Sequence, residues 1–112
     1  MPPFDVVAEQ RAAADALRRE FPGMPPLVEL DIADMIFRTR GASCVWLKRG
    51  LPEWVRAEAM ATAWVRHQES PYDQLLPRRG DRGREWRVRL ARDLVRPRVQ
   101  SILLAWRQKA HG

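Results

Sequence analysis

The stretch from Leu51 to Leu76, LPEWVRAEAMATAWVRHQESPYDQLL, constrains the fold more than any other part of the sequence. Its apolar side chains recur every three or four residues, which is the spacing of one face of an α-helix. We expect this helix over Trp54–Gln68, because Pro71 disfavours helical geometry at the residue before it. Its inward face is predicted to consist of Trp54, Ala57, Ala61, Trp64, Val65 and Gln68. Its other side is predicted to carry Arg56, Ala59, Ala63 and His67.

Two helices are expected before this stretch. The first covers Phe4 to Glu20, and its predicted apolar face is Phe4, Val7, Ala14, Leu17 and Phe21. The second covers Leu27 to Arg40 and ends at Gly41, with a predicted apolar stripe of Val28, Ile32, Met35 and Ile36. Ala42–Gly50 is expected to be a loop packed through Val45 and Leu47. In that loop Trp46 either joins the core or forms an exposed basic-aromatic patch with Lys48 and Arg49.

A last helix is expected over Arg82–Lys109, with Asp81 as its N-cap. Pro97 removes a backbone donor and should kink this helix or divide it into two pieces. Before Pro97 the predicted apolar arc is Trp86, Leu90, Ala91, Leu94 and Val95. After it the predicted stripe is Val99, Ile102, Leu103 and Trp106. Asp73 is expected to cap a short turn between the two long helices. The sequence therefore predicts an all-α fold, a small bundle of four to five helices.

The length of the chain predicts the number of domains, and its charge distribution indicates the kind of partner. At 112 residues the chain is expected to form a single domain over residues 1–112, long enough to bury a core without disulfides or metal. Residues 1–35 hold three arginines against seven acidic residues, whereas residues 36–112 hold 17 basic against seven acidic residues. This polarity favours an anionic partner for the C-terminal part, although a solvated arginine-rich surface would have the same composition.

The sequence also indicates where such a protein works. Its single cysteine, Cys44, cannot form an internal disulfide, which suits a reducing compartment. Met1–Phe4 has no basic segment leading into an apolar run, and no apolar run approaches the roughly 20 residues that span a bilayer. We expect a cytoplasmic protein of bacterial origin, without a membrane partner.

The strongest functional signal is the charge between Arg78 and Arg98, where nine arginines stand against three acidic residues. Arginine forks bind phosphate bidentately, and a basic loop followed by a helical arginine stripe suits contact with a nucleic-acid backbone. We expect non-catalytic binding of nucleic acid, DNA rather than RNA, and no cofactor. The predicted contact residues are Arg78, Arg79, Arg82, Arg89, Arg92 and Arg96, the last four on one arc opposite Trp86, Leu90 and Leu94.

Two alternatives remain open from the residues alone. Arg66, His67, Tyr72 and Asp73 form a polar cluster that either ties the helix end to the turn or serves an enzyme, with His67 as base and Asp73 orienting it. No glycine-rich phosphate loop, nucleophile elbow or metal-ligand set accompanies them. Five tryptophans also suit a protein-interaction module, for instance a homodimer through the Val99–Trp106 stripe.

Several of these segments resemble a known family. The block Arg66-His67, Tyr72-Asp73 and Leu75-Leu76, followed by a basic helix ending in Ala105-Trp106-Arg107, is similar to the bacterial and fungal family of unknown function called DUF2293. Phe21–Pro26, FPGMPP, resembles the family's start, while Ser70-Pro71 and Gly41–Gly50 depart from its pattern. The similarity spans roughly residues 21–107. It implies a small helical domain and no particular activity.

Overall fold

The structure is a computed structural model that describes residues 5–78 and 80–108. Five α-helices and two short 3₁₀ turns follow one another along the chain, and the described residues contain no strand. The elements are α1 (Val6–Glu20), α2 (Val28–Arg40), η1 (Gly41–Ser43), η2 (Val45–Leu47), α3 (Glu53–Gln68), α4 (Tyr72–Leu75) and α5 (Arg84–Arg107). The predicted all-α fold is therefore confirmed.

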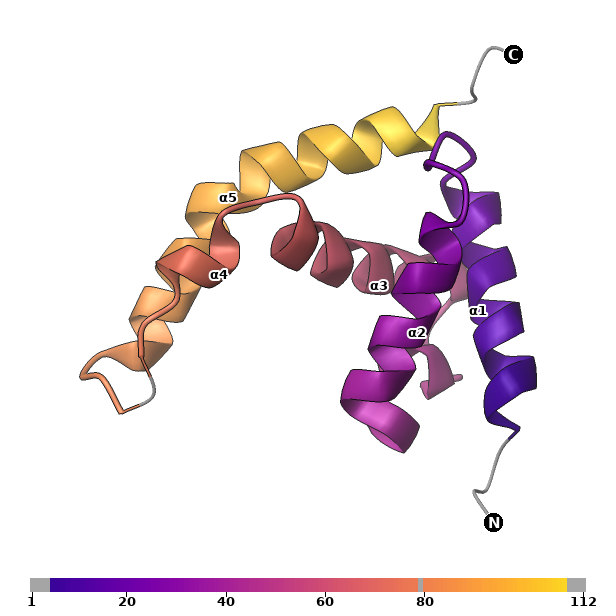
Figure 1. Cartoon of the computed structure of the whole chain (residues 1–112), viewed down its shortest axis with the longest axis horizontal. Helices are drawn as coiled ribbons and strands as arrows, with labels where there is room; N and C mark the ends of the chain where they lie inside the picture. The colour runs from indigo at the N-terminus through magenta and orange to yellow at the C-terminus, as the bar shows by residue number, and fades with distance from the viewer. Residues whose placement is uncertain (1–4, 79, 109–112) are drawn as a thin grey trace.

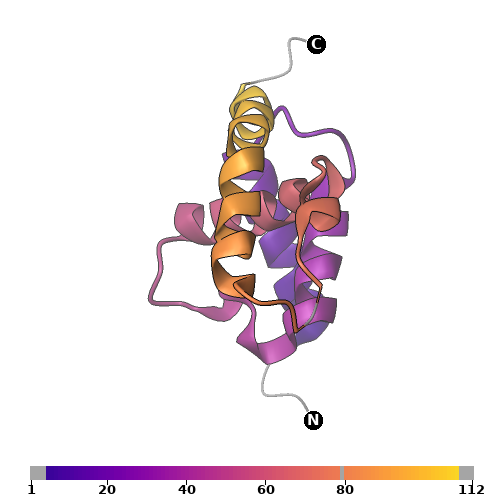
Figure 2. The ribbon, with the colours of Figure 1, turned by 90° about the vertical axis from the view of Figure 1, so that its left-hand side faces the viewer.

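The helices form a flat molecule, with principal extents of 43 × 41 × 23 Å. In Figure 1, α1 and α2 stand side by side, α3 lies between them and α4, and α5 runs along the top until it reaches the turn between α1 and α2. Figure 2 shows the narrow dimension, with α5 upright near the middle of the view. The buried apolar residues form one continuous cluster, to which all the long helices contribute. No helix among the described residues has the length and apolar character that crossing a bilayer requires.

Helix α1 begins one residue after Asp5, whose carboxylate accepts a hydrogen bond from the Ala8 amide at 3.2 Å and so caps the helix. Phe4, the expected start, lies outside the described residues. The prediction that Val7 faces inward is wrong, because its side chain is exposed. The other predicted positions within the described residues, Ala14, Leu17 and Phe21, are buried. The alanines of the buried face let α1 approach its neighbours closely.

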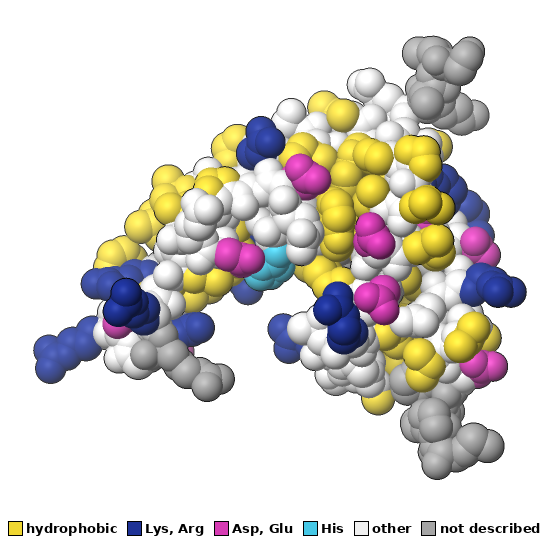
Figure 3. Space-filling view, in the orientation of Figure 1, with side chains coloured by type: hydrophobic (Ala, Val, Ile, Leu, Met, Phe, Trp, Pro, Cys, Tyr) yellow, Lys and Arg dark blue, Asp and Glu magenta, His cyan; other side chains and the backbone are white. Residues whose placement is uncertain are grey.

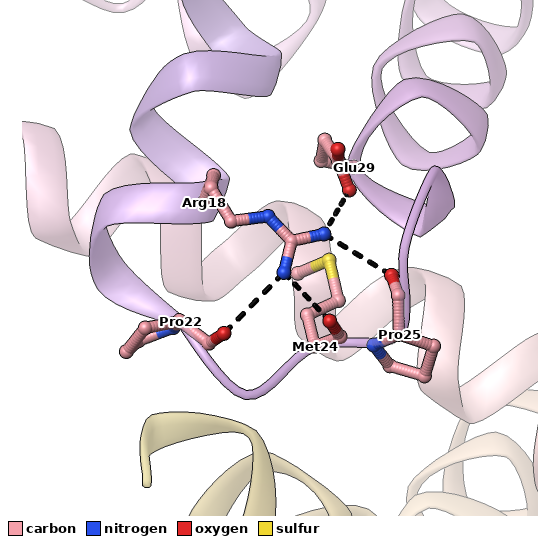
Figure 4. A network of polar contacts seen from close by, with 5 residues as sticks. All are labelled: Arg18, Pro22, Met24, Pro25 and Glu29. Atoms are coloured by element: carbon pink, nitrogen blue, oxygen red, sulfur yellow. Dashed lines mark hydrogen bonds and ion pairs between the residues drawn. The ribbon is translucent and has the colours of Figure 1, made fainter. Parts of the chain in front are cut away.

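The connection between α1 and α2 is held by one arginine. Arg18 donates to the carbonyl oxygens of Met24 at 2.6 Å, Pro25 at 3.1 Å and Pro22 at 3.4 Å, and it forms an ion pair with Glu29 on α2 (Figure 4). All three prolines of this turn lack a backbone N–H, so few backbone donors are available for its carbonyl oxygens. The Arg18 guanidinium supplies such donors from α1.

The same turn receives the end of α5. The Gly23 amide donates to the carbonyl oxygen of Trp106 at 2.7 Å, and the Trp106 ring meets Phe21 edge to face at a centroid distance of 6.4 Å. A Cβ atom on Gly23 would lie 2.1 Å from the carbonyl oxygen of Gln108. This close approach of two backbones accounts for the glycine, and it docks α5 against the first half of the chain.

The segment between α2 and α3 differs from the prediction in its anchors. It contains two 3₁₀ turns, and its fully buried side chains are Cys44 and Trp46, while the predicted Val45 and Leu47 are partly buried against the core. The Trp46 indole donates to Glu9 on α1 at 2.8 Å, so this tryptophan belongs to the core and not to an exposed patch. Arg56 on α3 donates to the Trp46 carbonyl at 2.8 Å and lies over its ring.

Helix α3 buries most of its predicted apolar stripe, since Ala57, Ala61 and Val65 are buried and Trp64 is partly buried. Trp54 and Gln68 are exposed, so their assignment to the inward face is wrong. Arg56, predicted to lie on the side opposite the stripe, is 9% exposed because its nitrogens bond to carbonyls of the preceding loop. The buried residues of α3 are Arg56, Ala57, Met60, Ala61 and Val65.

Helix α5 is continuous through Pro97, and its axis changes direction between the orange and yellow parts in Figure 1, as a proline-containing helix is expected to bend. It begins at Arg84 rather than Arg82, after Gly83 in a left-handed conformation. Asp81 is not its cap, since that carboxylate accepts from the Arg78 amide at 2.8 Å. The predicted Lys109 end lies outside the described residues, and the helix ends at Arg107.

The burial along α5 corrects the predicted inward arc of its first half. Trp86, Leu90 and Leu94 are exposed, so their assignment to the inward arc is wrong, whereas Ala91 and Val95 of the same arc are buried. After Pro97 the predicted stripe holds, with Val99, Leu103 and Trp106 buried and Ile102 partly buried. The buried face of α5 is Ala91, Val95, Val99, Leu103 and Trp106.

We predict that Gly23→Ala destabilises the protein by about 1–3 kcal/mol, the usual cost of forcing an extra methyl group into a packed site. Chemical denaturation followed by circular dichroism measures this change. Gly50→Ala is the matched control, because a Cβ there meets no atom within 4 Å. Equal stability of the two variants would show that the C-terminal end of α5 does not pack closely against Gly23.

Candidate nucleic-acid interface

Three arginines from two helices line one groove. Arg66 stands in the last turn of α3, and Arg92 and Arg96 stand one turn apart on α5. The groove between the helices has a volume of about 360 Å³, and its floor is formed by Val95, Val99 and Leu103. Thr62 and Gln100 add polar groups to its walls. We call Arg66, Arg92 and Arg96, with the hollow between them, the arginine groove.

The packing of α5 on α3 determines the geometry of the arginine groove. Val95 and Val99 are buried, which sets the rotation of α5 so that Arg92 and Arg96 flank the contact. Arg98 adds a polar tie, since its Nε donates to the carbonyl oxygen of Glu69 just beyond α3 at 2.6 Å. The side chains of the groove therefore project from two helices whose relative position is fixed by packing.

The groove carries uncompensated positive charge. Burial lowers the pKa of the Arg66 guanidinium, and the charges of Arg92 and Arg96 lower it further, while Tyr72 acts in the opposite direction. Within residues 5–78 and 80–108, neither Arg66 nor Arg92 has an ion-pair partner, whereas Arg96 pairs with Asp93 at 2.5 Å. Glu58 also lines the hollow, but it bonds to Arg107 at 3.1 Å. An anion bound here would relieve repulsion among the three cations.

The other predicted contact residues do not line the arginine groove. Arg82 precedes α5 and lies beyond the left-handed Gly83, so the predicted four-residue arc is wrong at that position. Arg78 and Arg89 are exposed, and Arg79 lies outside the described residues. In Figure 3 dark-blue side chains gather where the loop before α5 and the start of α5 project from the body of the molecule. These arginines extend the basic surface without forming a second lined groove with Arg92.

The predicted polar cluster is assembled in space. His67 Nδ1 lies 2.6 Å from Asp73 Oδ1, and the His67 ring meets the Tyr72 ring edge to face at 5.2 Å. The Arg66 guanidinium lies over the Tyr72 ring, 5.4 Å from the ring centre. Tyr72 is buried, while His67 and Asp73 are exposed. The cluster therefore joins the end of α3 to α4 and supports Arg66 at the edge of the groove.

Two local details differ from the sequence prediction. Asp73 lies inside α4 and does not cap it; the Ser70 hydroxyl accepts a bond from the Tyr72 amide at 3.3 Å instead. Arg66 was assigned to the structural cluster alone, and its place in the groove was missed. The sequence shows that Arg66 is a charged residue near the end of a helix. It does not show that the docking of α5 places Arg92 and Arg96 next to it. Among the described residues, no three histidine, cysteine or acidic side chains gather as a metal site.

The family comparison agrees with this architecture. The sequence model of the family described as "Uncharacterized conserved protein (DUF2293)" matches residues 16–107. The chain belongs to DUF2293. The match spans the α1–α2 turn, the polar cluster and the whole of α5, so this member carries its arginine groove entirely within the family region. No curated protein and no solved structure matched the DUF2293 chain.

We predict a clear order of stabilities within the polar cluster. His67→Ala should cost at most about 1 kcal/mol, since the contact with Asp73 that it removes is exposed. Tyr72→Ala should cost about 3–5 kcal/mol, the loss typical of a buried aromatic ring. Urea denaturation of both variants, with the exposed neighbour Gln68→Ala as control, measures the order. A larger loss for His67→Ala than for Tyr72→Ala would contradict a supporting role for the exposed pair.

Proposed function

We propose that this protein binds nucleic acid without catalysing a reaction, through phosphate contacts with the arginine groove and the arginines around it. DNA is the polymer we expect. The observation that carries the proposal is the groove itself, in which Arg66 and Arg92 have no ion-pair partner among the described residues and are held close together by packing. Guanidinium groups placed in this way favour phosphate, which offers several acceptor oxygens to several donors at once.

The surrounding charge supports a polymer rather than a single small anion. Arg78, Arg82 and Arg89 are exposed near the start of α5 and lie outside the groove. A nucleic-acid backbone presents a row of phosphates, so it would engage the groove and this outlying surface together. The enzyme alternative has less support, because His67 and Asp73 do not line the arginine groove and their pair is exposed.

We predict that the double variant Arg66→Gln, Arg92→Gln weakens binding similarly across sequences. The slope of log affinity against log salt should fall by about one unit for each lost phosphate contact. Fluorescence anisotropy with labelled oligonucleotides at several salt concentrations measures both quantities.

The control variant Arg11→Gln, Arg40→Gln removes the same charge from two exposed arginines of α1 and α2. It should leave the salt slope nearly unchanged. If both double variants lose affinity equally, binding follows net charge and the groove is not the site. If the parent protein fails to bind at low salt, the nucleic-acid proposal itself is rejected.

A protein-interaction function is the second candidate, and a different observation favours it. The outward side of α5 exposes four large apolar side chains: Trp86, Leu90, Leu94 and Leu104. Such a row of apolar side chains on one helix face is usual at protein interfaces. The Val99–Trp106 stripe is not available for a homodimer, because Val99, Leu103 and Trp106 are buried in the chain's own core. A homodimer would have to use the outward side.

We predict for this second candidate that Leu90→Glu, Leu94→Glu abolishes any self-association of the protein, and that high salt does not. Sedimentation velocity over a range of protein concentrations measures the association. Val7→Glu, Leu30→Glu is the control, since it adds the same charges at exposed apolar positions of α1 and α2. A protein that sediments as a monomer at all concentrations would exclude the homodimer.

A further inference from the structure

The arginine groove continues along one face of α3. A second hollow of about 490 Å³ adjoins it and shares Glu58, Thr62 and Arg66 with it. Its far end is formed by Trp54, whose side chain is 57% exposed. The surface between Trp54 and Arg66 therefore changes from an aromatic wall at one end to a cluster of cations at the other.

The floor of this second hollow suits a flat, weakly polar group. Ala59 and Ala63 leave the helix surface low, so a planar ring can approach the backbone closely. Thr62 supplies a hydroxyl group within the floor. Glu58 is the acidic group in the path of a phosphate chain, and its pairing with Arg107 at 3.1 Å offsets that charge. An aromatic wall, a low floor and a cationic end together match the chemistry of a nucleotide chain.

The spacing decides between one nucleotide and a strand. Trp54 and Arg66 are separated by 12 positions of a continuous helix, which corresponds to about 18 Å along its axis. A single mononucleotide is too short to place its base on Trp54 and its phosphate among Arg66, Arg92 and Arg96. A strand of a few nucleotides reaches both ends.

We propose that this face binds single-stranded nucleic acid, with phosphates in the arginine groove and an unpaired base stacked on the Trp54 indole. The inference rests on the proposed function and narrows it to one form of the polymer. Bases in a duplex have their faces covered by their neighbours, so a duplex cannot offer a ring to Trp54. Grooves for single strands combine basic side chains with exposed aromatic rings in this way.

The chain contains its own control for this proposal. Trp86 is exposed to nearly the same extent, 53%, and it also lies near an arginine, since Arg87 is 5.9 Å from its ring centre. Trp86 is on the outer side of α5 and lines neither hollow of the groove. Loss of each indole removes the same chemical group at similar exposure, but Trp86 lines a separate pocket, with Arg84 and Arg89.

The test uses labelled single strands of about 12 nucleotides, a length within the usual range of single-strand sites, and the matching duplex. Trp54→Ala should weaken binding of single-stranded DNA and RNA by about 5- to 100-fold, the loss expected for one stacked base. Trp86→Ala should change it less than about twofold, and Trp54→Phe should restore part of the affinity, because a smaller ring still stacks. Duplex binding should not respond to Trp54→Ala.

The outcomes separate this inference from the proposed function. If single strands bind in a way that depends on Arg66 and Arg92 but not on Trp54, the nucleic-acid function stands and this inference is wrong. A parent protein that prefers duplex, or a Trp86→Ala variant that loses more affinity than Trp54→Ala, overturns it as well. If Trp54→Ala loses more affinity for one of single-stranded DNA and RNA, that polymer is the one whose bases stack on Trp54. Circular dichroism verifies that both alanine variants remain folded, as expected for exposed positions.

Discussion

The contact between Trp106 and the turn that follows α1 is the constraint on which the rest of the molecule depends. The Trp106 ring meets Phe21 and Trp64, and its carbonyl accepts the Gly23 amide. This fixes one end of α5 against α1 and α3, while Val95 and Val99 pack nearer its middle. The positions of Arg92 and Arg96 relative to Arg66 follow from that docking. The groove is thus a consequence of apolar packing some distance away, which holds three like charges together against their mutual repulsion.

Two arginines of α3 show opposite solutions to burying charge. Arg56 is almost fully buried, and carbonyl oxygens of Trp46 and Leu51 accept its hydrogen bonds. Arg66 is partly buried beside other cations, and these surroundings lower its pKa. Its guanidinium makes a cation–π contact with the Tyr72 ring. The first arrangement holds a loop to a helix. The second leaves the Arg66 guanidinium without a side-chain hydrogen bond to any described residue.

Sequence periodicity predicted the all-α fold and the second half of α5, because Val99, Leu103 and Trp106 repeat at helical spacing and the core covers that half. It failed for Trp86, Leu90 and Leu94, because periodicity shows that a helix has an apolar face and not that another element covers it. It also failed for Arg56, since pairing with loop carbonyls depends on the path of the loop. Arg92 and Arg96 were identified as candidates from charge alone. Their neighbour Arg66 could not be, because the distance between α3 and α5 is a tertiary property.

The Gly23–Trp106 bond joins segments that lie far apart along the chain, and this affects the order in which the protein can assemble during synthesis. Helices α1, α2 and α3 contact one another directly, so they can begin to pack while α5 is still being made. Until Trp106 leaves the ribosome, Phe21 and Trp64 lack an aromatic neighbour and remain open to solvent or to a chaperone. The arginine groove therefore forms last, and a nascent chain exposes its apolar interior before the three arginines come together.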